Sequence, residues 1–437
     1  MSGDAVDSEV VDLCRELVRF DTSNYGDSSG PGERKAAEYV ATLLDEVGIE
    51  ARLYESAPGR TSVVADWGGS GPTARTDRLL LHGHLDVVPA AAEDWQVDPF
   101  AGEVIDGYLW GRGTVDMKDF DAMLLAVVRH RQRTGRVPER PVVLCFTADE
   151  EAGGHSGAEY LVNHQRHELE GCTEAVGEVG GFSTTVRGRR LYLIEAAEKG
   201  MAWLKLTSRG TAGHGSMINP NNAVERLSAA VARIGAYEWP VRLTPTMEVL
   251  LATVGDLAGT EVTPETAPDL IEEFGGAARM LGAVISNTLQ PTMLQAGYKV
   301  NVVPTEATAF LDGRFLPGYE EEFMATLEEL VGEGITIEAL SHQQPWETPY
   351  DGALVASMER SILAEDPEAI VAPYLMSGGT DAKHFRDIGG LRSYGFAPLR
   401  LPDDLDFTAL FHGVDERVPV DALRFGARVF DRFLDEV

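Results

Sequence analysis

Short runs that are apolar at almost every position, separated by segments of helical periodicity, constrain the fold of this chain most strongly. One strand is predicted over Arg78 to Leu81, and a second over Pro141 to Thr147 (PVVLCFT). Amphipathic helices are predicted over Glu33 to Val47 and over Asp119 to Arg133. Strands that are apolar on both faces need helices on both sides of their sheet. The pattern therefore predicts an α/β fold built on a covered, mixed sheet.

The pattern changes near residue 199, where the predicted elements follow the order β-α-β-β-α-β of a ferredoxin-like α+β unit. These elements are a strand over 201–210, a helix over Asn222 to Ile234, strands over 295–303 and 305–315, a helix over Glu320 to Val331, and a strand over 335–340. The segment 239–287 is extra to this unit, and we expect it to be a mostly helical insertion. Helix and strand patterns alternate again after residue 343. We therefore expect a first domain of residues 1–198 and 343–437, with the ferredoxin-like domain of residues 199–342 inserted into it.

The composition excludes several classes of function. The chain has 37 Lys and Arg residues but 70 Asp and Glu residues, and its net charge of -33 would repel a nucleic acid. The odd number of cysteines, Cys14, Cys145 and Cys172, gives no disulfide framework and indicates a reducing compartment. The segment 7–20 is charged throughout, unlike a signal peptide, and no apolar run approaches the about 18 residues of a membrane span. We predict a cytoplasmic protein with no membrane partner.

The strand over Arg78 to Leu81 runs into His82, His84 and Asp86, which would share one face of an extended chain. Asp86 is placed to accept the second ring N–H of His84 and so to orient the ring. Among the other acidic or histidine positions, Asp116 leads into a helix and the run 149–151 follows a predicted strand, where open α/β sheets place their sites, while Glu178 and His412 follow short apolar stretches. These positions are Asp116, Asp149, Glu150, Glu151, Glu178 and His412. Each has a plain structural interpretation, such as a helix cap for Asp116 or a core histidine for His412.

Taken together, these residues suit a pair of divalent metal ions with mixed nitrogen and oxygen ligands. One carboxylate can bridge two ions through its two oxygens. Neighbouring side chains diverge in the run Asp149-Glu150-Glu151, so one can bind metal while the next holds the nucleophilic water. A carboxylate that binds no metal beside such a water is suited to hydrolysis.

Nine motifs in series carry a resemblance over nearly the whole chain. They are HGHLDVVP, WGRGTVDMKD, TADEEAGG, GEVGG, RGTAGHGSMINPNNAVERL, KVNVVP, DGRFLPG, SGGTDAKHF and FHGVDERV. In this order they resemble the co-catalytic zinc metallopeptidases, which include glutamate carboxypeptidase, carboxypeptidase S, aminoacylase, acetylornithine deacetylase and succinyl-diaminopimelate desuccinylase. The motif SGGTDAKHF is most similar to the carboxypeptidase S branch. The resemblance implies an α/β catalytic domain with an inserted ferredoxin-like lid or dimerisation domain.

The resemblance also implies a role for each candidate. It makes His84 and Glu178 ligands of the first metal, Glu151 and His412 ligands of the second, Asp116 the bridge, Asp86 the partner of His84, and Glu150 the general base. His82 then has no role in the site. The ions would be two Zn²⁺ per chain, although Co²⁺ or Mn²⁺ would suit the same ligands.

In the inserted domain, His214 matches a histidine that binds the scissile carbonyl, and in dimeric relatives it reaches the site of the other subunit. Asn301 matches an asparagine at that site, Arg314 an arginine that holds a substrate carboxylate, and Gly379 and Thr380 a loop that touches the substrate. A surface ion pair is the alternative interpretation of Arg314. The extra segment 239–287 departs from the family's short lid, which puts lid closure and the meeting of two subunits in doubt.

The function implied is hydrolysis of an amide bond next to a free carboxylate, in dipeptides, C-terminal residues or N-acyl amino acids. A biosynthetic desuccinylase or deacetylase is the alternative enzyme. A catalytically silent, metal-stabilised binding protein is the alternative of another class, but it would not need Glu150.

Overall fold

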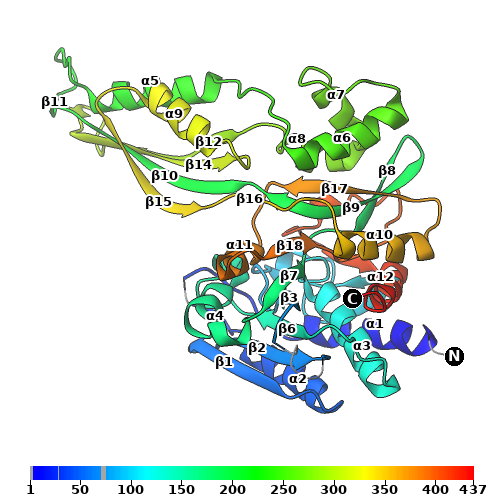
Figure 1. Cartoon of the computed structure of the whole chain (residues 1–437). Helices are drawn as coiled ribbons and strands as arrows, with labels where there is room; N and C mark the ends of the chain where they lie inside the picture. Colours follow the sequence, from blue (N-terminus) through cyan, green and yellow to red (C-terminus); the bar gives the residue numbers. More distant parts are fainter. Residues whose placement is uncertain (1–2, 28, 70–74) are drawn as a thin grey trace.

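The structure is a computed structural model that describes residues 3–27, 29–69 and 75–437. Within these residues its largest element is a mixed sheet of ten strands in the order β1-β2-β6-β3-β7-β18-β9-β16, with β8 and β17 paired to β9 (Figure 1). Strands β6, β3, β7 and β18 are parallel neighbours. The strands are β1 (Ala51–Ala57), β2 (Arg60–Trp67), β3 (Arg78–His84), β6 (Val142–Thr147), β7 (Cys172–Gly177), β8 (Phe182–Val186), β9 (Arg189–Glu198), β16 (Trp346–Glu347), β17 (Ile370–Met376) and β18 (Arg392–Gly395).

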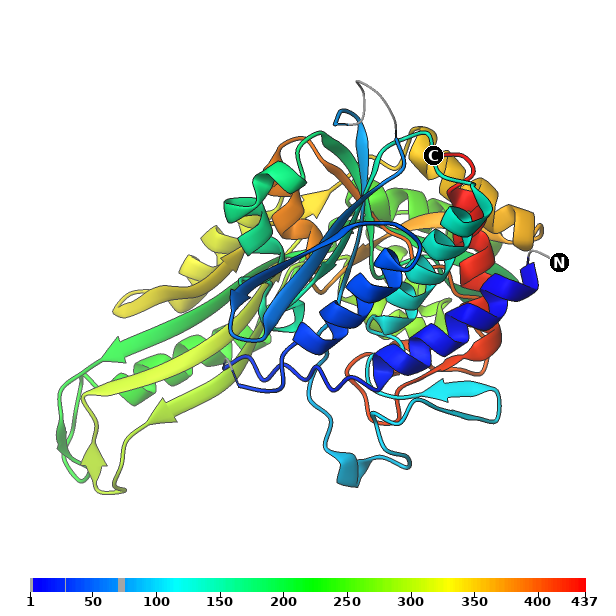
Figure 2. The same cartoon turned by 90° about the horizontal axis from the view of Figure 1, so that it is seen from below.

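Helices lie on both faces of this sheet. They are α1 (Gly3–Val18), α2 (Arg34–Asp45), α3 (Lys118–Thr134), α4 (Ala158–His164), α10 (Ala353–Glu365), α11 (Ala382–Phe385) and α12 (Val420–Phe433). The prediction of a helix over Asp119 to Arg133 is confirmed within one residue at each end by α3, which Gly135 ends in a left-handed conformation. Helices α1, α3 and α12 pack side by side, and Figure 2 shows both chain ends on their side of the molecule.

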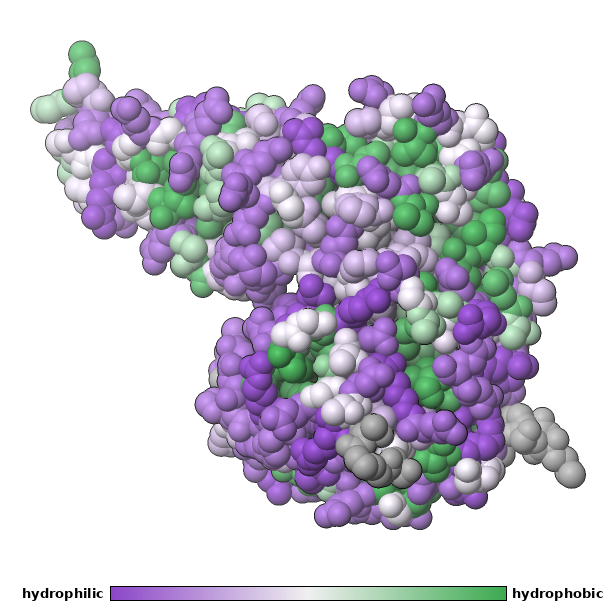
Figure 3. All heavy atoms as spheres, viewed as in Figure 1, coloured by the Kyte–Doolittle hydropathy of each residue, from purple (hydrophilic) through white to green (hydrophobic). Residues whose placement is uncertain are grey.

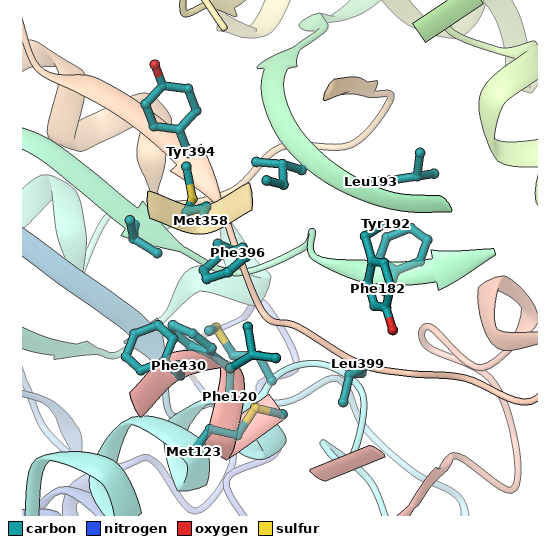
Figure 4. Close-up of a cluster of buried hydrophobic side chains, with 14 of the residues drawn as sticks. Phe120, Met123, Phe182, Tyr192, Leu193, Met358, Tyr394, Phe396, Leu399 and Phe430 are labelled. Carbon is teal, nitrogen blue, oxygen red and sulfur yellow. The ribbon is translucent and has the colours of Figure 1, made fainter. Parts of the chain in front are cut away.

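Alternate residues of β3 show why the sheet is covered on both sides. Leu79 and Leu81 belong to a hydrophobic core that includes residues of α1, α3 and α12. Leu80 belongs to a separate core with residues of α4 and α11. Figure 4 shows part of the first core, in which Phe120 and Phe430 meet in an edge-to-face contact with 5.5 Å between ring centres. The prediction that helices cover both faces of the sheet, which was made from its continuously apolar strands, is confirmed.

A second, four-stranded antiparallel sheet has the order β12-β14-β10-β15. Its strands are β10 (Gly200–Arg209), β12 (Thr288–Ala296), β14 (Glu306–Phe315) and β15 (Ile335–Gln343), and its helices are α5 (Ala223–Ala236) and α9 (Glu320–Val331). We name these six elements the ferredoxin-like unit, because they follow the predicted order β-α-β-β-α-β. Both helices cover one face of its sheet, where they share a hydrophobic core with the strands (Figure 1).

One predicted strand of this unit is wrong. The alternating run 295–303 was expected to form a strand, but β12 ends at Ala296 and Gly297 turns the chain with a φ of +67°. The apolar side chains of Tyr298 and Val300 are then exposed to solvent. Of this run, only the first two residues, in β12, and the last two, as β13 (Val302–Val303), are in strands, and β13 pairs with β11 (Gly213–His214). Alternation predicts a strand only where one face is buried, and here neither face is.

The extra segment 239–287 is helical, as expected. It contains α6 (Pro245–Ala258), α7 (Ala267–Glu272) and α8 (Ala278–Gly282). Thr244 caps α6 by accepting a hydrogen bond from the Met247 N–H, and proline follows at the first helical position. The apolar side chains of these helices join the core of the large sheet, and α6 packs on β17. The insertion therefore extends the core of the large sheet and leaves the ferredoxin-like unit as a projecting arm (Figure 1).

The described residues also form a small antiparallel sheet of three strands. It has the order β19-β5-β4 and consists of β4 (Glu103–Ile105), β5 (Tyr108–Trp110) and β19 (Arg417–Pro419). The three cysteines are free and buried, which agrees with their prediction as unpaired residues. Among the described residues, none of the helices combines the length and the apolar character that a membrane span requires.

Candidate metal centre

Three neighbouring parallel strands bring the candidate residues to one edge of the large sheet. His84 is the last residue of β3, Glu178 follows the end of β7, and Glu150 and Glu151 begin a short 3-10 turn after β6. Because β6, β3 and β7 are parallel and adjacent, their carboxyl ends deliver these side chains to the same place. Asp116 reaches it from the loop that precedes α3.

The side chains form two groups that share Asp116. In the first, His84 Nε2 lies 3.0 Å from Asp116 Oδ1 and 3.3 Å from Glu178 Oε2. In the second, His412 Nε2 lies 3.2 Å from Asp116 Oδ2 and 3.1 Å from Glu151 Oε2. Each group offers three ligand atoms close enough to hold one metal ion. The two oxygens of Asp116 thus face different groups, which is the geometry of a bridging carboxylate.

Glu150 lies beside these groups without belonging to either. Its Oε2 is 4.0 Å from His84 Nε2, and the residue is buried. Its backbone N–H donates to Asp86 Oδ1 over 3.0 Å, and that of Glu151 donates to Asp86 Oδ2 over 3.1 Å. The two adjacent glutamates are therefore held by one carboxylate while their side chains diverge.

The expected role of the Asp86 carboxylate needs correction. His84 Nδ1 is paired with the backbone oxygen of Asp86 at 3.0 Å, whereas the Asp86 carboxylate is 3.7 Å away. The carboxylate instead accepts three donors, namely the two N–H groups of Glu150 and Glu151 and the side-chain amide of Asn24, at 2.8 Å. Asp86 still orients His84, but through its main chain.

The buried carboxylates of the site favour the binding of cations. Burial raises the pKa of Glu178 well above its usual range, although His84 opposes the shift. Burial and the charge of Asp116 raise the pKa of Glu151 to about 8. Burial also raises the pKa of Glu150, against the charges of His84 and Lys383. These carboxylates are crowded where water is scarce, so divalent cations would remove both their desolvation cost and their mutual repulsion.

Both histidines respond to the same negative charge. Hydrogen bonds with Asp116 and then Glu151 raise the pKa of His412 to about 10. Burial lowers the pKa of His84, but Glu178 and Asp116 outweigh it and raise the pKa well above its usual range. Only a neutral imidazole binds metal, so an ion entering either group would take the place of a proton. The donor set of imidazoles and carboxylates fits zinc or a similar divalent ion.

His82 takes no part in the site. Its ring is buried against Phe385, with 4.9 Å between ring centres, and burial lowers its pKa to about 3. It is a neutral packing residue, in agreement with the prediction.

His214 and Asn301 are not brought to the metal centre of their own chain. His214 lies in β11, and the Gly215 N–H that follows it donates to the backbone oxygen of Asn301 over 3.0 Å. Figures 1 and 2 place β11 at the end of the ferredoxin-like unit that projects away from the large sheet. The exposed residues Met217 and Ile218 lie in the same loop, and Figure 3 shows hydrophobic atoms at this tip.

The other substrate candidates lie nearer the junction of the two sheets. Arg314, in β14, donates to Asp312 through Nε over 2.7 Å and Nη2 over 3.2 Å, so the ion pair named as its alternative is present. The N–H and hydroxyl of Thr380 both donate to Glu198, the last residue of β9. Gly379 lies beside the side chain of Lys383, since a Cβ built on this glycine would be 3.7 Å from Lys383 Nζ.

Two buried polar residues close to the centre were missed by sequence reasoning. The Asn24 amide donates to Asp86 at 2.8 Å and to Asp149 at 3.0 Å, and its oxygen accepts from Arg60. Glu416 accepts four hydrogen bonds from the segment 112–116. Glu416 lies within the motif FHGVDERV, but no local pattern indicated its partners.

Comparison with known proteins decides the family. The model of peptidase family M20/M25/M40 matches residues 80–436. The chain belongs to this family. The match includes every residue of the two metal-binding groups, and it confirms the resemblance carried by the nine motifs.

Individual M20 relatives span nearly the whole chain. Human aminoacylase-1 is 29% identical over 434 residues, which cover 97% of this chain and 94% of that protein. A probable carboxypeptidase S-like protein of Dictyostelium discoideum is 26% identical over 445 residues, with 95% and 82% covered. The crystal structure of an M20 family metallo-carboxypeptidase, Sso-CP2 of Sulfolobus solfataricus, matches with a TM-score of 0.72 and 19% identity, covering 98% of this chain and 99% of that one. This structural likeness shows that the fold is shared.

Proposed function

We propose that this M20 family member hydrolyses an amide bond next to a free carboxylate in small substrates, namely dipeptides, C-terminal residues or N-acyl amino acids. One observation carries the proposal. Two groups of three ligand atoms share Asp116, while Glu150 lies 4.0 Å from His84 and belongs to neither. A spare carboxylate beside a dinuclear site serves hydrolysis, because a purely structural site needs no base. The same point argues against a silent binding protein.

We assign His84 and Glu178 to one divalent ion, Glu151 and His412 to a second, and Asp116 to both. Three protein ligands per ion leave a position for substrate or water, as catalytic sites do. Zinc is the expected ion. When bound, the ions would polarise the scissile carbonyl and lower the pKa of the attacking water.

In this scheme Glu150 takes the proton of the attacking water and passes it to the leaving amine nitrogen. Its position suits both steps, because Glu150 lies beside both groups of metal ligands and its own carboxylate belongs to neither. Asp86 holds the backbone of Glu150 and Glu151, so the base and a metal ligand keep a fixed relation.

We assign binding of the substrate carboxylate to Arg314, with Gly379 and Thr380 as a neighbouring loop. A guanidinium suits a carboxylate because it can donate two parallel hydrogen bonds. Arg314 already makes such a pair with Asp312, so the substrate would compete with or extend this contact.

We propose that residues 199–342, apart from the helices α6 to α8 that join the core of the large sheet, act as a lid and dimerisation domain, through which His214 and Asn301 reach the metal centre of a second copy. Support comes from the tip of the ferredoxin-like unit, where Met217 is 70% exposed and Ile218 is 99% exposed. Such apolar exposure beside a polar candidate is typical of a contact surface. His214 would donate to the oxyanion that forms when water attacks the carbonyl.

The trans role of His214 has a direct test. His214→Ala and Glu150→Gln, each nearly inactive, are co-expressed in equal amounts. Half of random two-fold dimers are then mixed, and each contains one site with an intact Glu150 and a donated His214. About a quarter of the wild-type activity should return on this isologous-dimer reasoning. A monomer in light scattering together with no recovered activity would reject the trans arrangement.

The substrate class is tested by a panel of dipeptides, N-acetyl, N-succinyl and longer N-acyl amino acids, assayed after metal loading. Cleavage of many dipeptides or N-acyl amino acids supports the proposal. Selective cleavage of one N-succinyl or N-acetyl diamino acid would instead indicate the biosynthetic alternative. We further propose a reducing, cytoplasmic location, on the basis of the three free cysteines.

A further inference from the structure

Glu416 is a buried carboxylate that the proposed reaction does not use. It is 0% exposed and lies four residues after His412, directly before β19. Buried carboxylates are costly unless they are paired and hydrogen-bonded, so its partners show what it stabilises. All four of them belong to the segment 112–116, which ends at Asp116.

The hydrogen bonds of Glu416 converge on this segment from both carboxylate oxygens. Oε1 accepts from the backbone N–H of Val115 at 2.6 Å and of Asp116 at 3.3 Å. Oε2 accepts from the Gly113 N–H at 3.1 Å and from Arg112 Nη1 at 2.7 Å. Three of the four donors are main-chain groups, so the carboxylate fixes the path of the backbone and is more than the partner of an arginine.

Backbone contacts next to Glu416 also join the strands that adjoin the two segments, β19 and β5. Arg417 of β19 pairs with Trp110 of β5, and the Gly111 N–H donates to the backbone oxygen of Glu416 over 3.0 Å. The segment that carries His412 is thereby fastened to the segment that carries Asp116. These are the two residues that face each other across the second metal-binding group.

We propose that Glu416 is a positioning residue for the dinuclear centre. It holds the main chain of Asp116 so that one carboxylate oxygen faces His84 and the other faces His412. A bridging carboxylate tolerates little displacement, because moving its carbon toward one ion moves it away from the other. Loss of the Glu416 carboxylate would therefore weaken binding of both ions, although Glu416 touches neither.

The inference rests on the metal sites of the proposed function and not on its substrate, so metal binding tests it without a turnover assay. Metal-free wild type and Glu416→Gln are titrated with Zn²⁺ against a competing chelator, and thermal unfolding of both metal-free proteins is recorded. The glutamine keeps the shape of the side chain but replaces one acceptor oxygen by a donor, which leaves two of the four N–H groups without a partner. Partners of metal ligands typically contribute 10–100-fold in affinity, so we expect Zn²⁺ to bind at least about 10-fold more weakly.

Glu168→Gln is the matched control. Glu168 is also buried in the large-sheet domain, and it accepts from Arg52 Nε at 2.8 Å and from Tyr54. It makes no contact with the segment 112–116 among the hydrogen bonds and ion pairs of the described residues. This variant should lower the unfolding temperature and leave the affinity for Zn²⁺ unchanged.

Wild-type affinity in Glu416→Gln, or equal loss of affinity in Glu168→Gln, would overturn the inference and leave Glu416 as an ordinary buried carboxylate. If Glu416→Gln does not fold, Glu416→Asp, whose carboxylate is withdrawn by one methylene, is titrated with the same expectation. A wild-type protein that binds two ions but cleaves no amide would contradict the proposed function alone. Unaltered Zn²⁺ affinity in an active variant would contradict only the role of Glu416.

Discussion

Replacing Glu150 by glutamine separates the chemistry of the site from its metal binding. Glu150 belongs to neither group of ligands, and its backbone contact with Asp86 does not depend on its side chain. Glutamine has nearly the same shape, so packing of this buried residue should be preserved. We therefore expect Glu150→Gln to keep its fold and both ions while it loses turnover.

The expected loss follows from the role of a proton acceptor. Positioned general acids and bases contribute about 10²–10⁴-fold to rate. At about 1.36 kcal/mol for each factor of ten, this is about 2.7–5.4 kcal/mol of transition-state stabilisation. A base at Glu150 would act on the water and the leaving amine and not on the remote carboxylate, so kcat should fall while KM changes little.

The assay combines elemental analysis of purified protein with steady-state kinetics on one dipeptide and one N-acyl amino acid. Glu151→Gln is the matched control, because it changes the adjacent residue in the same 3-10 turn. Glu151 Oε2 lies 3.1 Å from His412 Nε2, so its replacement should weaken one metal site. Equal metal loss in the two variants would contradict the assignment of Glu150 as the base and Glu151 as the metal ligand. A decrease of less than 10-fold for Glu150→Gln would refute its role as the base.

Three further outcomes are expected. Wild-type protein loaded with zinc should contain two ions per chain by elemental analysis, and a value of one or zero that added metal does not change would contradict the shared Asp116. Substrates with an amidated C-terminus should be cleaved about 10–100-fold less efficiently, since a hydrogen bond from Arg314 to a charged group contributes about 1.5–3 kcal/mol; equal kcat/KM for acids and amides would contradict this. Leu250→Ala in α6 should cost about 2–5 kcal/mol in urea unfolding, because Leu250 is fully buried in the core of the large sheet, whereas Val249→Ala, at a side chain 45% exposed, should cost far less.

The elements that sequence predicted well are those with a strong local pattern. Strands β3 and β6 are apolar on both faces, and α3 has helical periodicity and a glycine at its end, so their places could be read from a few neighbouring residues. The strand expected over 295–303 failed because alternation alone cannot tell whether a face is covered. In the structure Gly297 turns the chain, and Val300 lies in solvent.

Part of the metal centre could be expected from the predicted topology. His84, Glu151 and Glu178 each lie at or just after the end of a parallel strand, and the ends of adjacent parallel strands meet. This arrangement predicts that the three residues lie close together, whereas their roles as metal ligands, and those of Asp116 and His412, were implied by the family resemblance. The partner of His84 was assigned to the wrong atom of Asp86, because backbone and carboxylate oxygens of one residue are equally near in sequence.

Residues that contact the site from remote parts of the sequence show no such local pattern. Glu416 and Asp116 are 300 positions apart, and Asn24 and Asp149 are 125 apart. An isolated glutamate or asparagine in a loop reads as an exposed polar residue unless its tertiary partners are known. The proposed role of His214 is harder still to predict, because it would depend on how a projecting arm meets a second copy of the chain. Local sequence can place a ligand at the end of a strand, but what holds that ligand, and what approaches it from outside, is set by contacts between segments that share no pattern.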